Sequence, residues 1–148
     1  NVNDKCTLYV GQKTYGQNRI YKPKKTKTQK FIPIDSETIR LDDFFKANNL
    51  LDKISFIKMD IEGSEFLALS GMKEILKLNK NIKIFTEVET SYLEDAGSSY
   101  DQFIDVLTEN NFTLSLADNR NEALIKVDRS QLKKILSSGD SVNILCVR

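Results

Sequence analysis

Histidine is absent from the 148 residues of this chain. Its absence excludes Ser/His and Cys/His nucleophile pairs, histidine general bases and histidine metal ligands. Any acid–base chemistry must therefore come from carboxylates, lysine, tyrosine or cysteine. The sequence also lacks any run of the roughly 18 apolar residues that a membrane-spanning helix needs, so we expect no membrane span.

Cysteine is scarce. Cys6 and Cys146 lie at opposite ends of the chain, and neither has a partner at the spacing of a zinc site. Their surroundings, CTLYV and NILCV, are apolar or β-branched, so we interpret both cysteines as reduced strand residues. Together with the composition, reduced cysteines predict a cytoplasmic protein.

The composition, with 40% hydrophobic and 29% charged residues, is that of a folded protein of one domain. The net charge of +1 hides an asymmetry, because residues 1–30 carry eight Lys or Arg and one acid. The positive charge is concentrated in residues 19–30 (RIYKPKKTKTQK). A basic run can neutralise phosphates, but this one has no aromatic platform and no nucleic-acid motif. We therefore interpret it as a solvated loop and do not expect nucleic acid as a partner.

Hydrophobic periodicity predicts strands that alternate with helices. The expected strands are 6–10, 19–21, 31–34, 54–59, 81–88, 112–116 and 142–147, and 124–127 is a short strand or a loop. The expected helices are 41–50, 64–78, 99–110 and 130–136. The run 54–59 (ISFIKM) is apolar at almost every position, which is typical of a parallel strand buried on both faces.

This order predicts an α/β fold with βαβ winding and helices on both faces of the sheet. We expect one domain over residues 1–148. Residues 1–30 would form a β-hairpin and a basic loop, and residues 31–148 the βαβ core. Tyr9, Tyr15 and Tyr21 either cover a substrate or belong to an ordinary hairpin addition.

The residues that can carry chemistry are concentrated in 56–65 (FIKMDIEGSE). Asp60, Glu62 and Glu65 lie where a strand ends and a helix begins, which is the place where α/β folds bind ligands. Gly63 fits a turn with a positive φ angle. Such carboxylates can bind a metal, accept a proton, or hydrogen-bond an amine or a hydroxyl.

A lysine within an apolar strand needs an explanation, because a buried and unpaired Lys58 would be costly. It must meet a carboxylate or reach the edge of the sheet. Glu87 ends the next strand, and adjacent parallel strands would bring it close to Asp60 and Lys58. The residues alone leave two interpretations open, a functional cluster and a structural network of ion pairs.

Three stretches, LDDFF (41–45), FIKMDIEGSEFLALSG (56–71) and IFTEVE (84–89), resemble the FkbM family of S-adenosylmethionine-dependent methyltransferases. The positions that match the family pattern are Leu41, Asp42, Lys58, Asp60, Glu62, Gly63, Glu65, Leu69, Gly71 and Glu87. The resemblance implies a Rossmann-like methyltransferase fold, S-adenosylmethionine as the cofactor, and methyl transfer to a hydroxyl of a sugar, polyketide or other secondary metabolite. The acceptor would be a small molecule or a glycan.

The resemblance also implies roles for individual residues. Asp60 would act as the base or contact the amino group of the cofactor, and Glu62 and Glu65 would orient the substrate or the turn. Lys58 would hold the carboxylates, and Glu87 would line the same cleft. We thus assign Asp60, Glu62, Lys58 and Glu87 to catalysis, Asp60 and Glu65 to cofactor binding, and no residue to a metal.

Two parts of the usual methyltransferase cofactor site are missing. No glycine-rich loop follows a buried first strand, since Gly11 and Gly16 lie in a polar hairpin, and no acidic residue ends a second strand. The sequence also begins at Asn1 rather than at a methionine. We expect the chain to be the C-terminal portion of a methyltransferase domain that lacks its first strands.

Two other classes of function remain open at this stage. One is a metal-dependent phosphoryl-transfer or nucleic-acid enzyme, in which Asp60, Glu62 and Glu87 would bind magnesium. The other is a non-catalytic methyltransferase-like module, whose exposed sheet edge would recruit a partner. A homo-oligomer is compatible with each of them.

Overall fold

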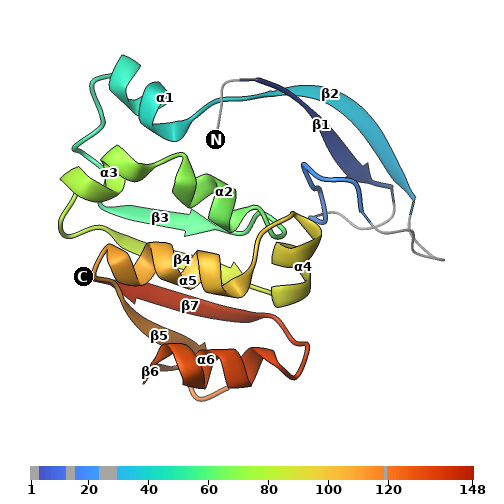
Figure 1. The fold of residues 1–148 in the computed structure, drawn as a ribbon. Helices are drawn as coiled ribbons and strands as arrows, with labels where there is room; N and C mark the ends of the chain where they lie inside the picture. Colours follow the sequence, from blue (N-terminus) through green and yellow to red (C-terminus); the bar gives the residue numbers. More distant parts are fainter. Residues whose placement is uncertain (1–3, 13–15, 24–29, 119) are drawn as a thin grey trace.

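Strands and helices follow one another along the chain, which a computed structural model describes for residues 4–12, 16–23, 30–118 and 120–148. The strands are β1 (Asp4–Gly11), β2 (Phe31–Thr38), β3 (Phe56–Met59), β4 (Lys83–Val88), β5 (Thr113–Asp118), β6 (Ala123–Val127) and β7 (Val142–Val147). The helices are α1 (Leu41–Ala47), α2 (Glu65–Ser70), α3 (Lys73–Leu78), α4 (Thr90–Asp95), α5 (Tyr100–Glu109) and α6 (Arg129–Leu136). Within the described ranges the strands form a two-stranded and a five-stranded sheet (Figure 1).

The five-stranded sheet has the order β3-β4-β7-β5-β6. Strands β3 and β4 are parallel, as expected, but β7 runs antiparallel to both β4 and β5, and β6 antiparallel to β5. The fold is therefore α/β, with a mixed sheet. Because β4 and β5 are both antiparallel to β7, they are parallel to each other, and α4 and α5 connect them. The predicted βαβ winding therefore extends from β3 to β5, and the antiparallel strands β6 and β7 depart from it.

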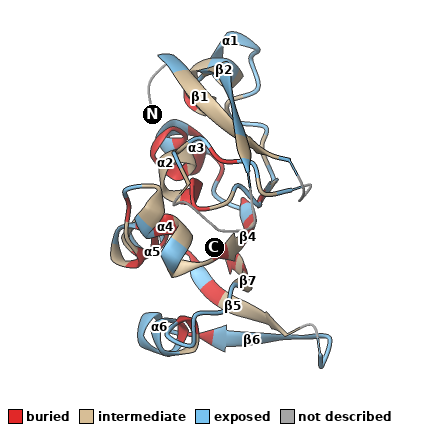
Figure 2. Ribbon diagram, turned by 90° about the vertical axis from the view of Figure 1, so that its right-hand side faces the viewer, coloured by how far each residue is buried: buried red, intermediate tan, exposed pale blue. Residues whose placement is uncertain are grey.

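Helices cover one face of this sheet in the described structure (Figures 1 and 2). Burial alternates along β4 accordingly: Ile84, Thr86 and Val88 are buried, whereas Lys83 is exposed and Phe85 is half-buried. The prediction of helices on both faces is thus wrong for the described residues. That prediction rests on the apolar character of the strands. A strand with half-buried aromatic and aliphatic side chains on an uncovered face has the same apolar sequence pattern.

Strand β3 is an edge strand, which corrects the prediction of a strand buried on both faces. Phe56 is 56% exposed, and Lys58 on the same face is exposed too. Met59 points to the helices and is buried. An apolar run does not reveal how many neighbours a strand has, and the edge position leaves Lys58 in contact with water.

The N-terminal hairpin pairs different strands from those expected. Strand β1 pairs antiparallel with β2 from Asp4↔Thr38 to Gly11↔Phe31. Residues 19–21 do not form a return strand, and Arg19 makes an isolated bridge to Tyr9. The described part of the basic run therefore lies beside this sheet, whereas residues 24–29 and Tyr15 are outside the described ranges.

The single helix predicted over 64–78 is divided into α2 and α3 at Gly71 and Met72. Its apolar stripe is confirmed: Leu69, Met72, Ile75 and Leu76 are buried, and Phe66 is half-buried. The two helices continue the same stripe, so the division does not alter which side faces the core.

Asp42 explains where α3 begins. Its buried carboxylate accepts hydrogen bonds from the backbone N–H groups of Glu74 and Ile75, both at 3.0 Å. These are donors that the first turn of a helix leaves without an intrahelical partner. The Leu-Asp-Asp motif thus links α1 to α3, a role that its position at a helix start did not predict.

Replacing Asp42 with alanine is expected to lower the free energy of unfolding by about 2–3 kcal/mol, because two buried backbone donors lose a charged acceptor. Urea denaturation followed by far-UV circular dichroism measures the loss. Asp52→Ala, at an exposed position before β3, is the control and should change little. Equal effects of the two substitutions would contradict the capping role.

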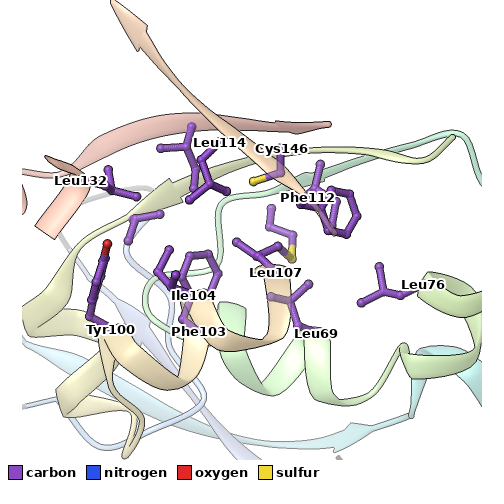
Figure 3. Packing of buried hydrophobic residues seen from close by; sticks show 14 of the residues in the cluster. Leu69, Leu76, Tyr100, Phe103, Ile104, Leu107, Phe112, Leu114, Leu132 and Cys146 are labelled. Atoms are coloured by element: carbon purple, nitrogen blue, oxygen red, sulfur yellow. The ribbon is translucent and has the colours of Figure 1, made fainter. Parts of the chain in front are cut away.

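The core lies between the helices and the covered face of the sheet. Phe103, Ile104 and Leu107 of α5 pack toward Leu114 and Cys146 (Figure 3). The inward face predicted for the helix at 99–110 is confirmed. Both cysteines lie in strands and are free, as expected. None of the helices in the described ranges is long and apolar enough to cross a membrane.

Candidate active site

The turn that follows β3 has a backbone that few sequences can adopt. Glu62 has a φ angle of 55° and Gly63 one of 95°. A Cβ atom at Gly63 would lie 2.2 Å from the backbone oxygen of Tyr92, so only glycine fits between the turn and α4. The turn predicted at 60–63 is confirmed, and its glycine is required by both conformation and space.

Glu65 stabilises this turn through hydrogen bonds with its backbone. Its buried carboxylate accepts hydrogen bonds from the backbone N–H groups of Ile61 (3.3 Å) and Gly63 (3.4 Å). Burial raises the pKa of Glu65, and these hydrogen bonds oppose the rise. Glu65 therefore orients the turn, which is one of the roles expected for it. Its assignment to cofactor binding stays a prediction.

Glu62 is paired with Arg19 across 43 positions of sequence. The guanidinium lies 3.2 Å from the Glu62 carboxylate, and the two side chains are only 9% and 12% exposed. The same guanidinium stacks over the ring of Tyr92, 4.0 Å from its centroid. Burial raises the pKa of Glu62, and the charge of Arg19 partly offsets this.

Tyr21 adds a second link between the N-terminal region and the turn. Its hydroxyl donates a 2.7 Å hydrogen bond to the backbone oxygen of Glu62. Burial raises the pKa of Tyr21 to about 12, so the phenol stays protonated and remains a donor at neutral pH. Sequence reasoning placed Arg19 in a solvated loop and missed this contact, since no local pattern shows which distant carboxylate a basic residue will meet.

Asp60 and Lys58 form an exposed ion pair, with 2.9 Å between Nζ and the carboxylate. Both side chains are half exposed or more, so the pair adds little to stability. It does orient the Asp60 carboxylate. Lys58 thereby satisfies both expectations stated for it, a carboxylate partner and a position at the edge of the sheet.

Glu87 lies at the end of β4, one position beyond the last register pair, Met59↔Thr86. Its carboxylate accepts a hydrogen bond from the hydroxyl of Ser141. Its charge also contributes to the raised pKa of Glu62. Asp60, Glu62 and Glu87 are all described, and they do not form a metal-binding group. The arrangement gives the magnesium-dependent alternative no support.

A cavity of about 480 Å³ lies beside Asp60, between the turn and the N-terminal hairpin. This volume is in the range of small-molecule sites. Asp60, Glu62 and Ser64 contribute its polar wall on one side, and Glu87 is not part of the lining. Most of the remaining wall is aliphatic; it includes Leu8, Ile20, Ile39, Leu41, Ile61 and Leu67.

The Ser64 hydroxyl in this wall makes no hydrogen bond. The residue is 6% exposed, and its Oγ has no hydrogen-bond partner. Ser64 occupies the N-cap position of α2, but its side chain makes no capping hydrogen bond. A buried polar atom without a partner is uncommon in proteins, and a bound water, an ion or a ligand at this wall would satisfy it.

Carboxylates beyond the end of a parallel strand, next to a cavity, are typical of the α/β proteins that bind small molecules at that edge of the sheet. The chain matches the family model of the methyltransferase FkbM domain over residues 1–114 and therefore belongs to this family. The match spans β1 to the start of β5 and includes every residue of the candidate site. Comparison with curated proteins and with solved structures gave no match.

Family membership has two consequences. FkbM methyltransferases depend on S-adenosylmethionine, and their fold is the Rossmann-like methyltransferase fold. The resemblance noted in the sequence is thus confirmed.

Proposed function

We propose that this chain carries the acceptor end of an S-adenosylmethionine-dependent O-methyltransferase, with Asp60 at the reacting end. The observation that carries the proposal is the cavity beside Asp60, with the unpartnered hydroxyl of Ser64 in the same wall. The acceptor would be a hydroxyl of a sugar or of a secondary metabolite.

The polar groups at this wall fit one end of the cofactor. A carboxylate is a suitable partner for an ammonium group, and the unpaired Ser64 hydroxyl can donate to a carboxylate or a hydroxyl. When bound, S-adenosylmethionine supplies an electrophilic methyl group on a sulfonium. The chain's own residues would hold and orient the acceptor hydroxyl and take its proton.

We assign to Asp60 the role of the base that takes the proton of the acceptor hydroxyl. During methyl transfer, the Asp60 carboxylate would accept the proton that the acceptor hydroxyl loses. Lys58 would hold that carboxylate through the 2.9 Å ion pair. Glu62, fixed by Arg19, and Glu65, fixed by backbone N–H groups, would keep the turn that carries Asp60 in place.

Asp60→Asn removes the proton acceptor and keeps the shape of the side chain. If Asp60 is the base, kcat should fall about 10²- to 10⁴-fold while binding of S-adenosylmethionine is retained. If it contacts the amino group instead, the Kd for S-adenosylmethionine should rise and kcat should change little. The measurements are calorimetric titration with S-adenosylmethionine and transfer of a labelled methyl group to a panel of alcohols and glycans.

Asp52→Asn is the matched control, because Asp52 is an exposed aspartate outside the cavity. It should leave both quantities unchanged. An Asp60→Asn protein with full activity and full cofactor affinity would overturn both roles of Asp60.

A non-catalytic module is the second candidate, and the open edge of β3 favours it. A groove of about 390 Å³ runs along this edge, lined by aliphatic and aromatic residues such as Phe45, Ile54 and Ile57. A chain that binds no S-adenosylmethionine and transfers no methyl group to any acceptor of the panel would support this candidate.

A further inference from the structure

Residues 18–21 lie beside β1, and their side chains make two different sets of contacts. Backbone hydrogen bonds between Tyr9 and Arg19, at 2.7 and 3.1 Å, attach the segment to β1. Arg19 and Tyr21 contact the turn after β3, whereas Asn18 and Ile20 line the cavity.

Arg19 and Tyr21 attach the segment to the turn after β3. Arg19 pairs with Glu62 and stacks on Tyr92, and the Tyr21 hydroxyl donates to the backbone of Glu62. These contacts fix the segment against the turn after β3. The position of Ile20 relative to Asp60 is consequently set by buried polar contacts.

Asn18 and Ile20 line the cavity, to which Asp60 and Ser64 also contribute. The Asn18 side chain already accepts a hydrogen bond from the backbone N–H of Gly11. Ile20 joins Leu8 and Ile39 in an aliphatic wall that offers no hydrogen bonds from side chains.

We propose that Ile20 is a specificity-determining residue, which selects acceptors that present an apolar ring face to the hairpin and a hydroxyl to Asp60 and Ser64. The proposal rests on the proposed function, because it treats the cavity as the acceptor site. Ile20 and Ile39 are 37% and 56% exposed, and Asn18, Thr38 and Arg40 also line the cavity, so hydroxyls of a bound ring can still meet water or polar side chains. The aliphatic part of the wall favours a ring through the apolar area that binding buries, about 25 cal/mol per Å². A ring with hydroxyls on every carbon has little such area to bury and should bind much more weakly than a ring with one hydroxyl.

Two probes of the same ring size test this directly: cyclohexanol, with one hydroxyl, and inositol, with a hydroxyl on every carbon. Binding is followed by NMR of the chain labelled at isoleucine methyl groups. Cyclohexanol should shift the signals of Ile20, Ile39 and Ile61 in a saturable manner. Inositol at the same concentration should not.

Ile20→Ala removes the aliphatic surface and is expected to weaken cyclohexanol binding about fivefold or more. Ile20→Val, which keeps most of it, should lie between Ile20→Ala and the unchanged chain. Ile32→Ala is the matched control, because Ile32 is an exposed isoleucine of β2 outside the cavity lining. It should bind cyclohexanol as the unchanged chain does.

Three results would overturn the proposal: inositol shifting the same signals with similar affinity, Ile20→Ala binding cyclohexanol normally, or shifts confined to Ile54 and Ile57 in the groove along β3. The test needs neither cofactor nor turnover. A failure here would leave methyl transfer at Asp60 untouched, and a failure of methyl transfer would leave the binding result standing.

Discussion

Gly63→Ala is expected to lower the free energy of unfolding by about 3–5 kcal/mol, which is a third or more of the stability of an ordinary domain. Two effects add up. The φ angle of 95° is unfavourable for any residue with a Cβ, and the new methyl group would meet the backbone oxygen of Tyr92 at 2.2 Å. Backbone cannot rotate away as a side chain can, so either the turn or α4 must move.

The chain offers a matched control in Gly97. Its φ angle is 82°, but a Cβ atom there would have nothing within 4 Å. Gly97→Ala should therefore cost only about 1 kcal/mol, the conformational part alone. Urea denaturation of both variants, followed by circular dichroism, separates the two effects. A Gly63→Ala protein no less stable than Gly97→Ala would show that the close approach to Tyr92 is not limiting.

Arg19→Met is expected to destabilise the chain by about 3–5 kcal/mol at neutral pH, because it leaves the Glu62 carboxylate buried without its counter-charge. The methionine fills much of the volume, so the loss reports on charge more than on packing. Removing one member of a buried pair is costly even where the pair itself contributes little.

The loss should depend on pH in a defined direction. Burial raises the pKa of Glu62 in the folded chain, and Arg19 opposes that rise, so Arg19→Met raises the pKa further. A carboxyl whose folded pKa lies above its unfolded pKa binds its proton more tightly when folded, and stability then falls as pH rises through the folded value. Arg19→Met should consequently lose more stability at pH 8 than at pH 5.

A double-mutant cycle with Glu62→Gln completes the test. Arg19→Met/Glu62→Gln removes both charges and should be more stable than either single variant at pH 8. Lys133→Met, which removes an exposed partner of Asp101, should have little effect at either pH. Additive effects of Arg19→Met and Glu62→Gln, with no dependence on pH, would mean that the two side chains do not interact.

Local patterns predicted the elements of the core well. The helix that carries Phe103, Ile104 and Leu107 has a clear apolar stripe, and the strand at 142–147 was predicted with the bounds of β7. Helix α4 was missed, because of its six residues only Leu93 is buried. A helix this short has no stripe that a periodicity argument can detect.

Neighbour relations were harder to predict. The apolar run ending at Met59 indicated a strand but not that this strand lies at the edge of the sheet. The sequences of the strands also did not show that helices cover one face of the sheet. The division into residues 1–30 and 31–148 stays a prediction. The order of strands depends on contacts between distant segments. Such contacts do not produce a periodic pattern in the sequence.

The turn that carries Asp60 and Glu62 was predicted at its place in the sequence, but its tertiary contacts were not. The turn at 60–63 follows from its charges and its glycine, together with the family resemblance. The role of Asp42 at α3, the anchor made by Arg19 and the unpaired hydroxyl of Ser64 all depend on tertiary contacts. The assignments of Asp60, Glu62, Lys58 and Glu87 to catalysis stay predictions that the variants above can test.

The pairing of Arg19 with Glu62 also bears on the order in which the chain folds. The β3 strand, its turn and α2 are adjacent in sequence and can form early, whereas the contact to Arg19 closes a loop of 43 positions. Closing such a loop costs chain entropy that is recovered only when the other long-range contacts exist. We therefore infer that the acidic turn acquires its final shape after the folding barrier. Substitutions of Arg19 would then speed unfolding more than they slow refolding.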